Sequence, residues 1–315
     1  MNKVIILGGA GFIGSNLVKR FCNSGYSVTV IDAFFDQTGA SINNIENYIS
    51  RITLFNKRVE DVDDLVHILN EQDLIIDCMG WTAHHEAINN PKMDIELNLI
   101  SHIAVINALR NSRNKSIIYL GSRGQYGNIH KSPIIEEDRM LPEDVQGINK
   151  LSAESFYRVY SKLYNFSVIS LRLPNCFGEN QITNYSDIGL IGGFIKRAIQ
   201  NNTIEVYGKN RKRSILYVED LVEIIDRLKE VTINGFMALN INGQFISISD
   251  LAKIIIEISN SGNLIIKPIP DEVNKIDMGN ASLSDLKLGE VLPNIIYSDI
   301  KSSLEKTINY FKKKR

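Results

Sequence analysis

Three evenly spaced glycines near the start of the chain restrict its possible folds more than any other feature. They are Gly8, Gly11 and Gly14. The apolar run Val4–Leu7 precedes them, and the helical pattern of Phe12–Phe21 follows. In such a strand–loop–helix unit the first glycine permits a tight turn, the second lets a pyrophosphate approach the backbone, and the third lets the helix pack on the strand. Glycine-rich turns occur elsewhere, but this position favours a dinucleotide-binding unit.

The residues around this loop indicate which dinucleotide it binds. The N–H groups of Phe12 and Ile13 begin the helix and would face the phosphates. Asp32 ends the next apolar run, roughly twenty residues beyond the loop. A carboxylate there accepts the ribose hydroxyls of an adenosine and repels a 2′-phosphate, which favours NAD(H) over NADP(H). Asp61 and Val62 are candidates to hold the adenine amino group, with capping of the following helix as an equal alternative for Asp61.

Short apolar runs alternate with helical patterns through the first half of the chain. Compact, β-branched runs lie at 4–7, 28–31, 52–55, 74–78, 117–120 and 168–173. Helical spacing of apolar residues occupies 12–21, 62–69, 97–109 and 148–164. Buried parallel strands are nearly continuous apolar runs, and a crossover, usually a helix, joins each to the next. The alternation therefore predicts an α/β protein with a Rossmann-type, doubly wound parallel sheet.

The regular alternation weakens after Pro174, where asparagine and glycine become more frequent. Helical patterns continue at 188–200, 218–228, 249–258 and 307–313. The chain has 315 residues, which exceeds the usual size of one domain. We expect residues 1–173 to form an NAD-binding domain, to which about 214–245 return. The rest of 174–315 is expected to form a smaller C-terminal α/β cap that binds substrate over the carboxyl ends of the strands.

Composition narrows the class of protein and its surroundings. The formal net charge of −1 gives no reason to expect a nucleic acid or an anionic membrane as partner. No apolar run has the length of a transmembrane segment, and the N-terminus lacks the features of a signal peptide. Cys22, Cys78 and Cys176 are odd in number and far apart, so they show neither metal-ligand spacing nor a disulfide framework. We expect a cytoplasmic protein without a bound metal.

Longer motifs along nearly the whole chain resemble those of one enzyme family. They are GGAGFIGSNL at 8–17, Asp32, Asp61-Val62, Asn90-Pro91 leading to Asn98, YLGSRGQYG at 119–127, QGINKLSAE at 146–154, LRLPNCFG at 171–178, VYGKNRKRSILYVED at 206–220 and NINGQFISISDLA at 240–252. In order and spacing the chain resembles the extended short-chain dehydrogenases/reductases. Within them it is similar to the NAD-dependent epimerase/dehydratase branch, which works on nucleotide sugars.

The resemblance implies roles for individual residues. Ser122 matches the family's catalytic Ser/Thr, which would hydrogen-bond the reacting sugar oxygen. Lys150 matches the lysine that holds the nicotinamide ribose, and Asn98 falls on the cofactor side. Asn175 and Arg213 match residues at the sugar diphosphate, where a planar cation suits phosphate oxygens. Taken singly, Ser122 is also compatible with a turn, Asn175 with a loop cap and Arg213 with a solvated hairpin.

One position departs from the family at the centre of its chemistry. The catalytic tyrosine is expected four residues before Lys150, and that position holds Gln146. The tyrosine removes the proton of the sugar hydroxyl, and glutamine has no usable pKa for this task. General acid–base catalysis supplies about 10²–10⁴ in rate, or roughly 3–5 kcal/mol of barrier. The chain is therefore a slow enzyme, an enzyme with a substitute base, or no enzyme.

Several residues are candidates for the substitute. His84 and His85 lie in the expected loop after the run 74–78, and an imidazole with a pKa of about 6.5 accepts a proton at neutral pH. A desolvated Lys150 is a second candidate. Arg123, beside Ser122, is a candidate to stabilise an alkoxide or to hold a substrate anion. For either histidine alone, a solvated loop is the more frequent outcome.

A second departure narrows the reaction. The family's 4,6-dehydratases place an Asp-Glu pair after the catalytic Ser/Thr, whereas this chain has Arg123 and Gly124 there, which argues against dehydration. The family also has an arginine late in the cap, and the nearest match to it in this chain is Lys275.

The motifs and these departures together indicate the function. We expect an NAD(H)-dependent oxidoreductase acting at a sugar carbon, C4, of a nucleotide-diphosphate sugar, as an epimerase or a net dehydrogenase in sugar-precursor biosynthesis. The alternative is a non-catalytic protein that binds NAD or a nucleotide sugar. The family's pairing of the helices matching 97–110 and 148–164 implies a homodimer or a higher homo-oligomer.

Overall fold

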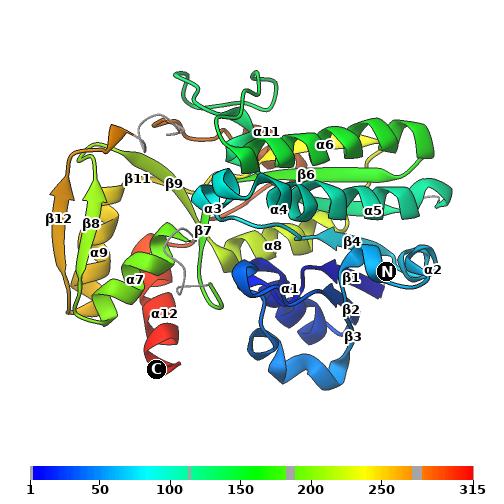
Figure 1. The fold of residues 1–315 in the computed structure, drawn as a ribbon, viewed down its shortest axis with the longest axis horizontal. Coiled ribbons are helices and arrows are strands. Elements are labelled where there is room, and N and C mark those ends of the chain that lie inside the picture. The colour runs from blue at the N-terminus through cyan, green and yellow to red at the C-terminus, as the bar shows by residue number, and fades with distance from the viewer. Residues whose placement is uncertain (1–2, 113–114, 182–188, 272–278, 315) are drawn as a thin grey trace.

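A computed structural model describes residues 3–112, 115–181, 189–271 and 279–314 (Figure 1). Its main sheet has seven parallel strands in the order β10-β6-β5-β4-β1-β2-β3. These strands are β1 (Lys3–Leu7), β2 (Ser27–Asp32), β3 (Ile52–Asn56), β4 (Leu74–Asp77), β5 (Ser116–Ser122), β6 (Ser167–Leu173) and β10 (Phe236–Asn240). The order reverses between β1 and β4, as in other doubly wound sheets.

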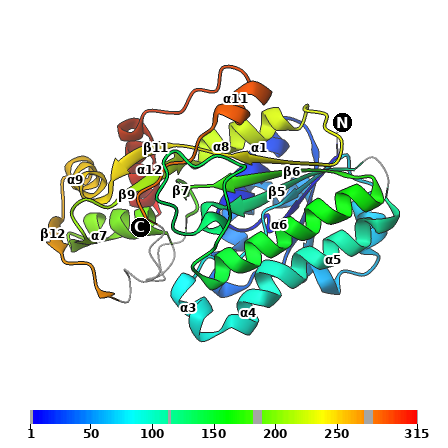
Figure 2. The same cartoon turned by 90° about the horizontal axis from the view of Figure 1, so that it is seen from above.

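Helices cover both faces of this sheet, as Figure 2 shows. One face carries α1 (Phe12–Asn23) and α8 (Val218–Leu228), which contact each other. The other carries α2 (Leu65–Asn70), α5 (Ser101–Ala108) and α6 (Val145–Tyr164). Two short helices, α3 (His84–Asn89) and α4 (Pro91–Ile95), and a π-helical turn at Glu96–Ile100 lead into α5. The predicted doubly wound Rossmann-type sheet is confirmed.

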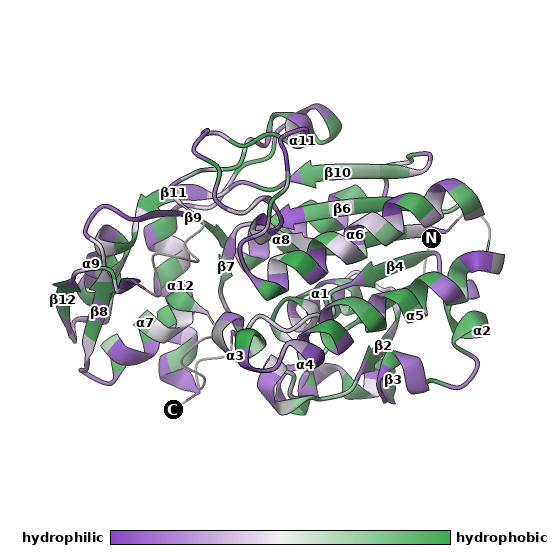
Figure 3. Cartoon of the chain, turned by 45° about the horizontal axis from the view of Figure 1, so that its top comes forward, coloured by the Kyte–Doolittle hydropathy of each residue, from purple (hydrophilic) through white to green (hydrophobic). Residues whose placement is uncertain are grey.

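The central strands are mainly apolar because both of their faces are buried. In β1, Val4 and Ile6 belong to the core beneath α1 and α8, whereas Ile5 and Leu7 belong to the core beneath α5 and α6. Successive side chains of a strand point to opposite faces, so two covered faces need an unbroken apolar run. Figure 3 shows the strands of this sheet as mainly hydrophobic and the helices around them as mixed.

A smaller lobe is built from two short sheets and three longer helices. Its sheets contain β7 (Asn175–Phe177), β9 (Lys212–Tyr217) and β11 (Gln244–Ser247), and the pair β8 (Thr203–Tyr207) and β12 (Asn263–Lys267). Its helices are α7 (Leu190–Ile199), α9 (Ile248–Ser259) and α12 (Ile300–Lys313), while α11 (Leu286–Val291) lies beside β10. Phe12 and Ile13 pack against this lobe's core. The start of α1 therefore joins the two lobes at the glycine loop.

The segment expected to return to the first domain divides between the lobes. Helix α8 and strand β10 belong to the large sheet and its helix layer, whereas β9 and β11 pair with each other in the small lobe. The helix expected at 62–69 begins only at Leu65, because Asp64 adopts a left-handed backbone at its N-terminus. No helix in the described ranges combines the length and apolar character needed to cross a bilayer.

Candidate active site

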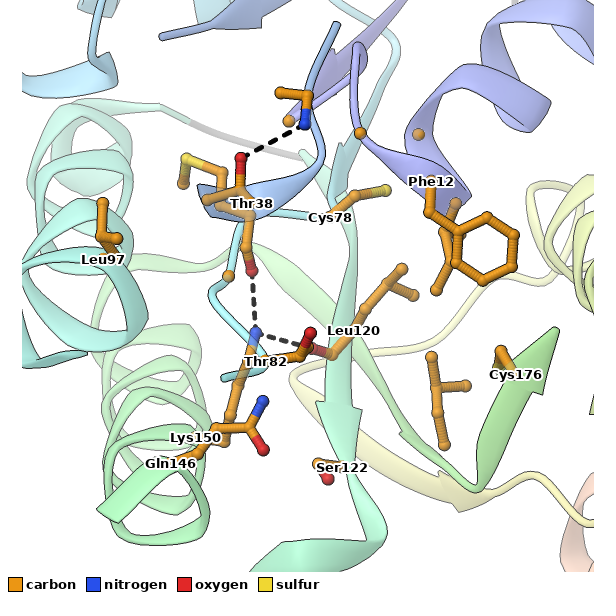
Figure 4. Close-up of a pocket in the computed structure, with 18 of the residues that line it drawn as sticks. Phe12, Thr38, Cys78, Thr82, Leu97, Leu120, Ser122, Gln146, Lys150 and Cys176 are labelled. Atoms are coloured by element: carbon orange, nitrogen blue, oxygen red, sulfur yellow. Dashed lines mark hydrogen bonds between the residues drawn. The ribbon is translucent and has the colours of Figure 1, made fainter. Parts of the chain in front are cut away.

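A cavity of about 420 Å³ lies between the two lobes at the carboxyl ends of the strands (Figure 4). Ligands of doubly wound proteins bind at this edge, where the strand order reverses. The loops after β1 and β4 contribute Gly8 and Cys78, the end of β5 contributes Ser122, and α6 contributes Gln146 and Lys150. The small lobe closes the cavity with residues of β7 and α7. The volume lies in the range of small-molecule and cofactor sites.

The glycine loop forms the wall of this cavity at the start of α1. Gly8 has a φ of +74°, and its N–H donates to the Ile31 carbonyl at 2.8 Å. A Cβ placed on Gly14 would lie 2.2 Å from the Gly8 carbonyl oxygen, so only glycine allows the helix to begin this close to the strand. Gly11 occupies the N-cap of α1 without a side chain. The loop thus presents a bare helix N-terminus to the cavity, which suits a pyrophosphate.

Asp32 lines the cavity and also secures the glycine loop. Its carboxylate accepts the N–H of Ala10 at 2.9 Å and the N–H of Phe34 at 2.8 Å. Burial raises the pKa of the carboxyl, and these two backbone hydrogen bonds oppose the rise. Asp32 therefore lies in the cavity beside the glycine loop, and its binding of a ribose stays a prediction.

The structure does not bring Asp61 or Val62 to the cavity. Asp61 is exposed at the end of a 3-10 turn, and Val62 is buried in the core. Asp61 does not cap α2, because Asp64 occupies that position instead. The contact of Asp61 and Val62 with adenine stays a prediction, made for two residues that do not line the cavity. The cavity wall in this region contains Arg58 and Glu60, whose side chains are hydrogen-bonded to each other at 3.0 Å. We found no sequence signal that separates these two residues from other surface charges.

Ser122 combines a turn role with a place in the cavity. Its hydroxyl oxygen accepts the N–H of Gly124 at 3.0 Å, and its own N–H donates to the Gln125 side chain at 2.7 Å. This capping box fixes the hydroxyl at the end of β5, where the O–H can still donate toward the cavity. The turn and the functional interpretations of Ser122 are therefore compatible.

Lys150 reaches across the site from α6. Its Nζ donates to the carbonyls of Met79 at 2.8 Å and Leu120 at 3.1 Å, as Figure 4 shows. Gly80 has a φ of +155°, and a Cβ placed on it would lie 2.9 Å from this Nζ. Only a residue without a Cβ at position 80 leaves room for the Lys150 side chain. Burial lowers the pKa of Lys150 to about 8, and the negative charge of Asp77 works in the opposite direction.

The lowered pKa of Lys150 predicts how stability depends on pH. Between pH 8 and about 10.5, the lysine of the unfolded chain keeps a proton that the folded chain has released. Stability then rises with pH, because the unfolded state binds more protons. We expect the wild type to gain about 3 kcal/mol relative to Lys150→Met across this interval. Urea titrations of both proteins at several pH values measure the difference, and parallel curves would contradict the prediction.

Gln146 and Asn98 both hold the loop after β4. The Gln146 amide lies in the cavity wall and donates to the Trp81 carbonyl at 3.1 Å. Asn98 is fully buried, accepts the Trp81 N–H at 2.9 Å and donates to its carbonyl at 2.9 Å. Asn98 does not line the cavity and positions this loop, and its predicted contact with the cofactor stays a prediction. No tyrosine lines the cavity within the described ranges.

His84 lies in the cavity wall as the first residue of helix α3, not in a solvated loop. Its Nδ1 is 2.7 Å from a carboxylate oxygen of Asp144. Asp144 is a buried N-cap of α6, which begins at Val145, before the 148 expected from the apolar spacing. The sequence did not predict the contact with His84, because it joins residues sixty positions apart. His85 follows in the same helix, and its side chain lies outside the described part.

The predicted substrate-binding residues separate into two groups. Arg123 is buried in the cavity wall and donates to the Gly279 carbonyl at 3.3 Å, and Asn175 of β7 also lines the cavity. Arg213 is buried outside the lining residues, where its guanidinium donates to the carbonyls of Lys212 at 2.8 Å and Gly279 at 3.1 Å. In this arrangement Arg213 contacts backbone carbonyls, and its predicted contact with the sugar diphosphate stays a prediction. Lys275 lies outside the described residues.

The geometry agrees with a family assignment made by comparison with known proteins. The model of the NAD dependent epimerase/dehydratase family matches residues 4–241, and the chain belongs to this family. Its cofactor is therefore NAD, and the glycine loop and Asp32 fit that cofactor.

Similar proteins include nucleotide-sugar enzymes and a solved structure with the same fold. The putative UDP-glucose 4-epimerase of Methanocaldococcus jannaschii is 26% identical over 321 aligned residues, which cover 98% of each chain. UDP-glucuronic acid decarboxylase 1 of Xenopus tropicalis is 28% identical, over 99% of this chain and 72% of its own. The crystal structure of UDP-glucose 4-epimerase from Thermotoga maritima with UDP-glucose has a TM-score of 0.88 at 22% identity and covers 99% of both chains. The relatives thus include nucleotide-sugar epimerases and decarboxylases.

Proposed function

We propose that this protein is an NAD-dependent oxidoreductase that acts at C4 of the sugar in a nucleoside diphosphate sugar, as an epimerase or as a net dehydrogenase. One observation carries the proposal. A single cavity joins the glycine loop and Asp32 at one side to Ser122 and Lys150 at the other. The N-terminal lobe would hold the cofactor, and the small lobe would cover the sugar nucleotide.

Each residue has a task in this proposal. The loop from Gly8 to Gly14 binds the pyrophosphate of NAD, Asp32 the adenosine ribose, and Lys150 the nicotinamide ribose. When bound, NAD takes a hydride from the sugar carbon. Ser122 donates its O–H to the sugar oxygen, while Asn175 lies on the side of the diphosphate. Arg123 places a cation beside Ser122, which suits an oxygen that gains negative charge.

Two observations limit the reaction. Arg123 and Gly124 follow Ser122, so the cavity lacks at this point the acid and base that elimination of water needs, and we exclude a 4,6-dehydratase from the proposal. Gln146 supports the alternative of a protein that binds NAD or a nucleotide sugar without turnover, because its amide is engaged by Trp81 and cannot remove a proton. The three cysteines are free thiols, which fits a protein of the reducing cytoplasm.

An absorbance experiment tests the proposed function. Purified protein saturated with NAD is mixed with UDP-glucose, UDP-glucuronic acid, GDP-mannose, CDP-glucose or dTDP-glucose, one at a time. We expect one of them to produce the near-ultraviolet band of reduced nicotinamide or to yield an epimer on product analysis. If NAD binds but no sugar nucleotide gives either signal, the binding protein is the correct assignment.

We also propose a homodimer formed by the helices α5 and α6. Helix α6 exposes Phe156, Val159 and Leu163 on one stripe, and the Leu163 side chain is 65% exposed. Light scattering is expected to give twice the 35.5 kDa of one chain. Leu163→Glu should shift the mass to that of a monomer, because it buries a charge in the contact. Leu286→Glu, at a still more exposed leucine of α11, is the control and should remain dimeric. A wild-type monomer would refute the proposal.

A further inference from the structure

The cavity holds few groups that accept a proton at neutral pH. Lys150, with its pKa lowered by burial to about 8, is mostly protonated at pH 7, and its Nζ already donates to two carbonyls. Burial raises the pKa of Cys78 and takes that of Cys176 to about 12, so both stay thiols. The hydroxyl of Ser122 and the amide of Gln146 are not bases in this range. Two carboxylates also line the cavity, but Asp32 already accepts the N–H groups of Ala10 and Phe34, and Glu60 accepts hydrogen bonds from Arg58 and Ser101. The lining side chain that remains with acid–base chemistry near neutral pH is the imidazole of His84.

The partner of His84 orients its ring. Asp144 Oδ2 lies 2.7 Å from His84 Nδ1, and the Asp144 side chain is 6% exposed. The other oxygen accepts the N–H of Gly147 at 2.6 Å, at the N-terminus of α6. Burial raises the pKa of Asp144, but the hydrogen bond and charge of His84 hold it below its usual value. A carboxylate on Nδ1 selects the tautomer in which that nitrogen carries the hydrogen, so proton exchange with a substrate would use Nε2.

Packing places this pair beside the residues that would hold the sugar. Gly147 lies against the turn after Ser122, because a Cβ on Gly147 would be 2.6 Å from the Gly124 carbonyl oxygen and 2.9 Å from Asp144 Oδ1. Gln146 fixes the Trp81 carbonyl, three residues before His84. The N-terminus of α6 therefore holds both the Ser122 turn and the loop that carries the histidine.

We propose that His84 is the catalytic acid–base residue of this site, that Asp144 positions it, and that Gln146 supports its loop in place of the tyrosine. The inference rests on the proposed function. In the oxidation step, the hydroxyl O–H bond of the sugar breaks and its proton goes to Nε2 of His84. The electrons of that bond form the carbonyl as the carbon loses hydride to NAD. In the reverse step Nε2 returns the proton.

Rapid mixing of NAD-loaded protein with the sugar nucleotides named above tests the role of His84. His84→Gln is expected to slow the appearance of reduced nicotinamide by about 10²–10⁴, with NAD affinity unchanged. His67→Gln, at an exposed histidine of α2 outside the cavity, is the matched control and should match the wild type. Adding Gln146→Tyr to His84→Gln should restore part of the rate, because the tyrosine supplies a base at its usual position.

Nitrogen NMR of the histidine rings tests the role of Asp144 without turnover. In the resting wild type we expect the neutral His84 ring to carry its hydrogen on Nδ1, and in Asp144→Asn to lose this preference. A wild-type His84 with the hydrogen on Nε2 would overturn the pair. If His84→Gln kept a rate within about twofold of the wild type, the loss would be far smaller than expected for a missing general base. That result would overturn the catalytic role of His84 and leave the proposed function untouched. A wild type that transfers no hydride from any sugar nucleotide overturns the proposed function and this inference with it.

Discussion

Gly14→Ala is expected to destabilise the protein by roughly 3 kcal/mol and to abolish retention of NAD. The new Cβ would lie 2.2 Å from the Gly8 carbonyl oxygen and 2.7 Å from the Gly9 Cα. Both are backbone atoms, so the loop and the start of α1 must separate, at the upper end of the usual cost of overpacking. The shift also moves the helix N–H groups that face the pyrophosphate. Urea denaturation and the absorbance of bound cofactor measure the two effects.

Gly193→Ala is the matched control for this prediction. Gly193 lies in helix α7, and a Cβ there has no heavy atom within 4 Å apart from its neighbours and its own helix. Because alanine is the better helix former, this variant should gain up to about 1 kcal/mol. A glycine-to-alanine substitution is thus expected to lower the stability at position 14 and to raise it at position 193. A Gly14→Ala protein that is as stable as the wild type and retains NAD would contradict the close packing of the loop.

Arg172→Met is expected to cost about 3–5 kcal/mol of folding free energy. Arg172 and Glu154 form an ion pair at 2.7 Å with side chains that are 4% and 3% exposed. Arg172 also donates to the hydroxyl of Tyr126, which donates to Asn240 of β10. Removing the arginine leaves a buried carboxylate without its cation beneath the Ser122 turn. Denaturant titrations measure the loss.

Two comparisons separate the ion pair from a general effect of the mutation. The double variant Arg172→Met with Glu154→Leu should be more stable than Arg172→Met alone, because no buried charge remains. Lys253→Met breaks an exposed pair with Asp250 and should change stability by less than about 0.5 kcal/mol. Equal losses in the single and double variants would show that the charge of Glu154 is not the cause.

The ion pair also predicts how the stability of the protein changes at low pH. Burial raises the pKa of Glu154, but the hydrogen bond and charge of Arg172 hold it below its ordinary value. A carboxyl whose pKa is lower in the folded state stabilises the protein above its unfolded pKa of about 4.3 and loses this contribution as the pH falls through the folded pKa. The wild type should therefore lose stability relative to the double variant below about pH 4.3.

The sequence by itself determined the large sheet and the cofactor loop, because both depend on local patterns. Apolar runs such as Val4–Leu7 appear as strands since both faces are buried, and the glycine spacing sets the turn into α1. The positions of Ser122, Gln146 and Lys150 in one cavity followed from the shared motif order. The starts of short helices such as α2 depend on a single backbone angle at Asp64 and were less predictable.

Only the tertiary structure decided which side chains meet. The contact of His84 with Asp144 and the burial of Arg213 against Gly279 join segments sixty or more positions apart. The exclusion of Asp61 from the cavity depends on how the segment after β3 turns, which no residue pattern showed. Such contacts arise from the packing of α6 and the small lobe on the sheet. A residue's type limits the chemistry it can perform, whereas its neighbours in space decide whether it performs that chemistry.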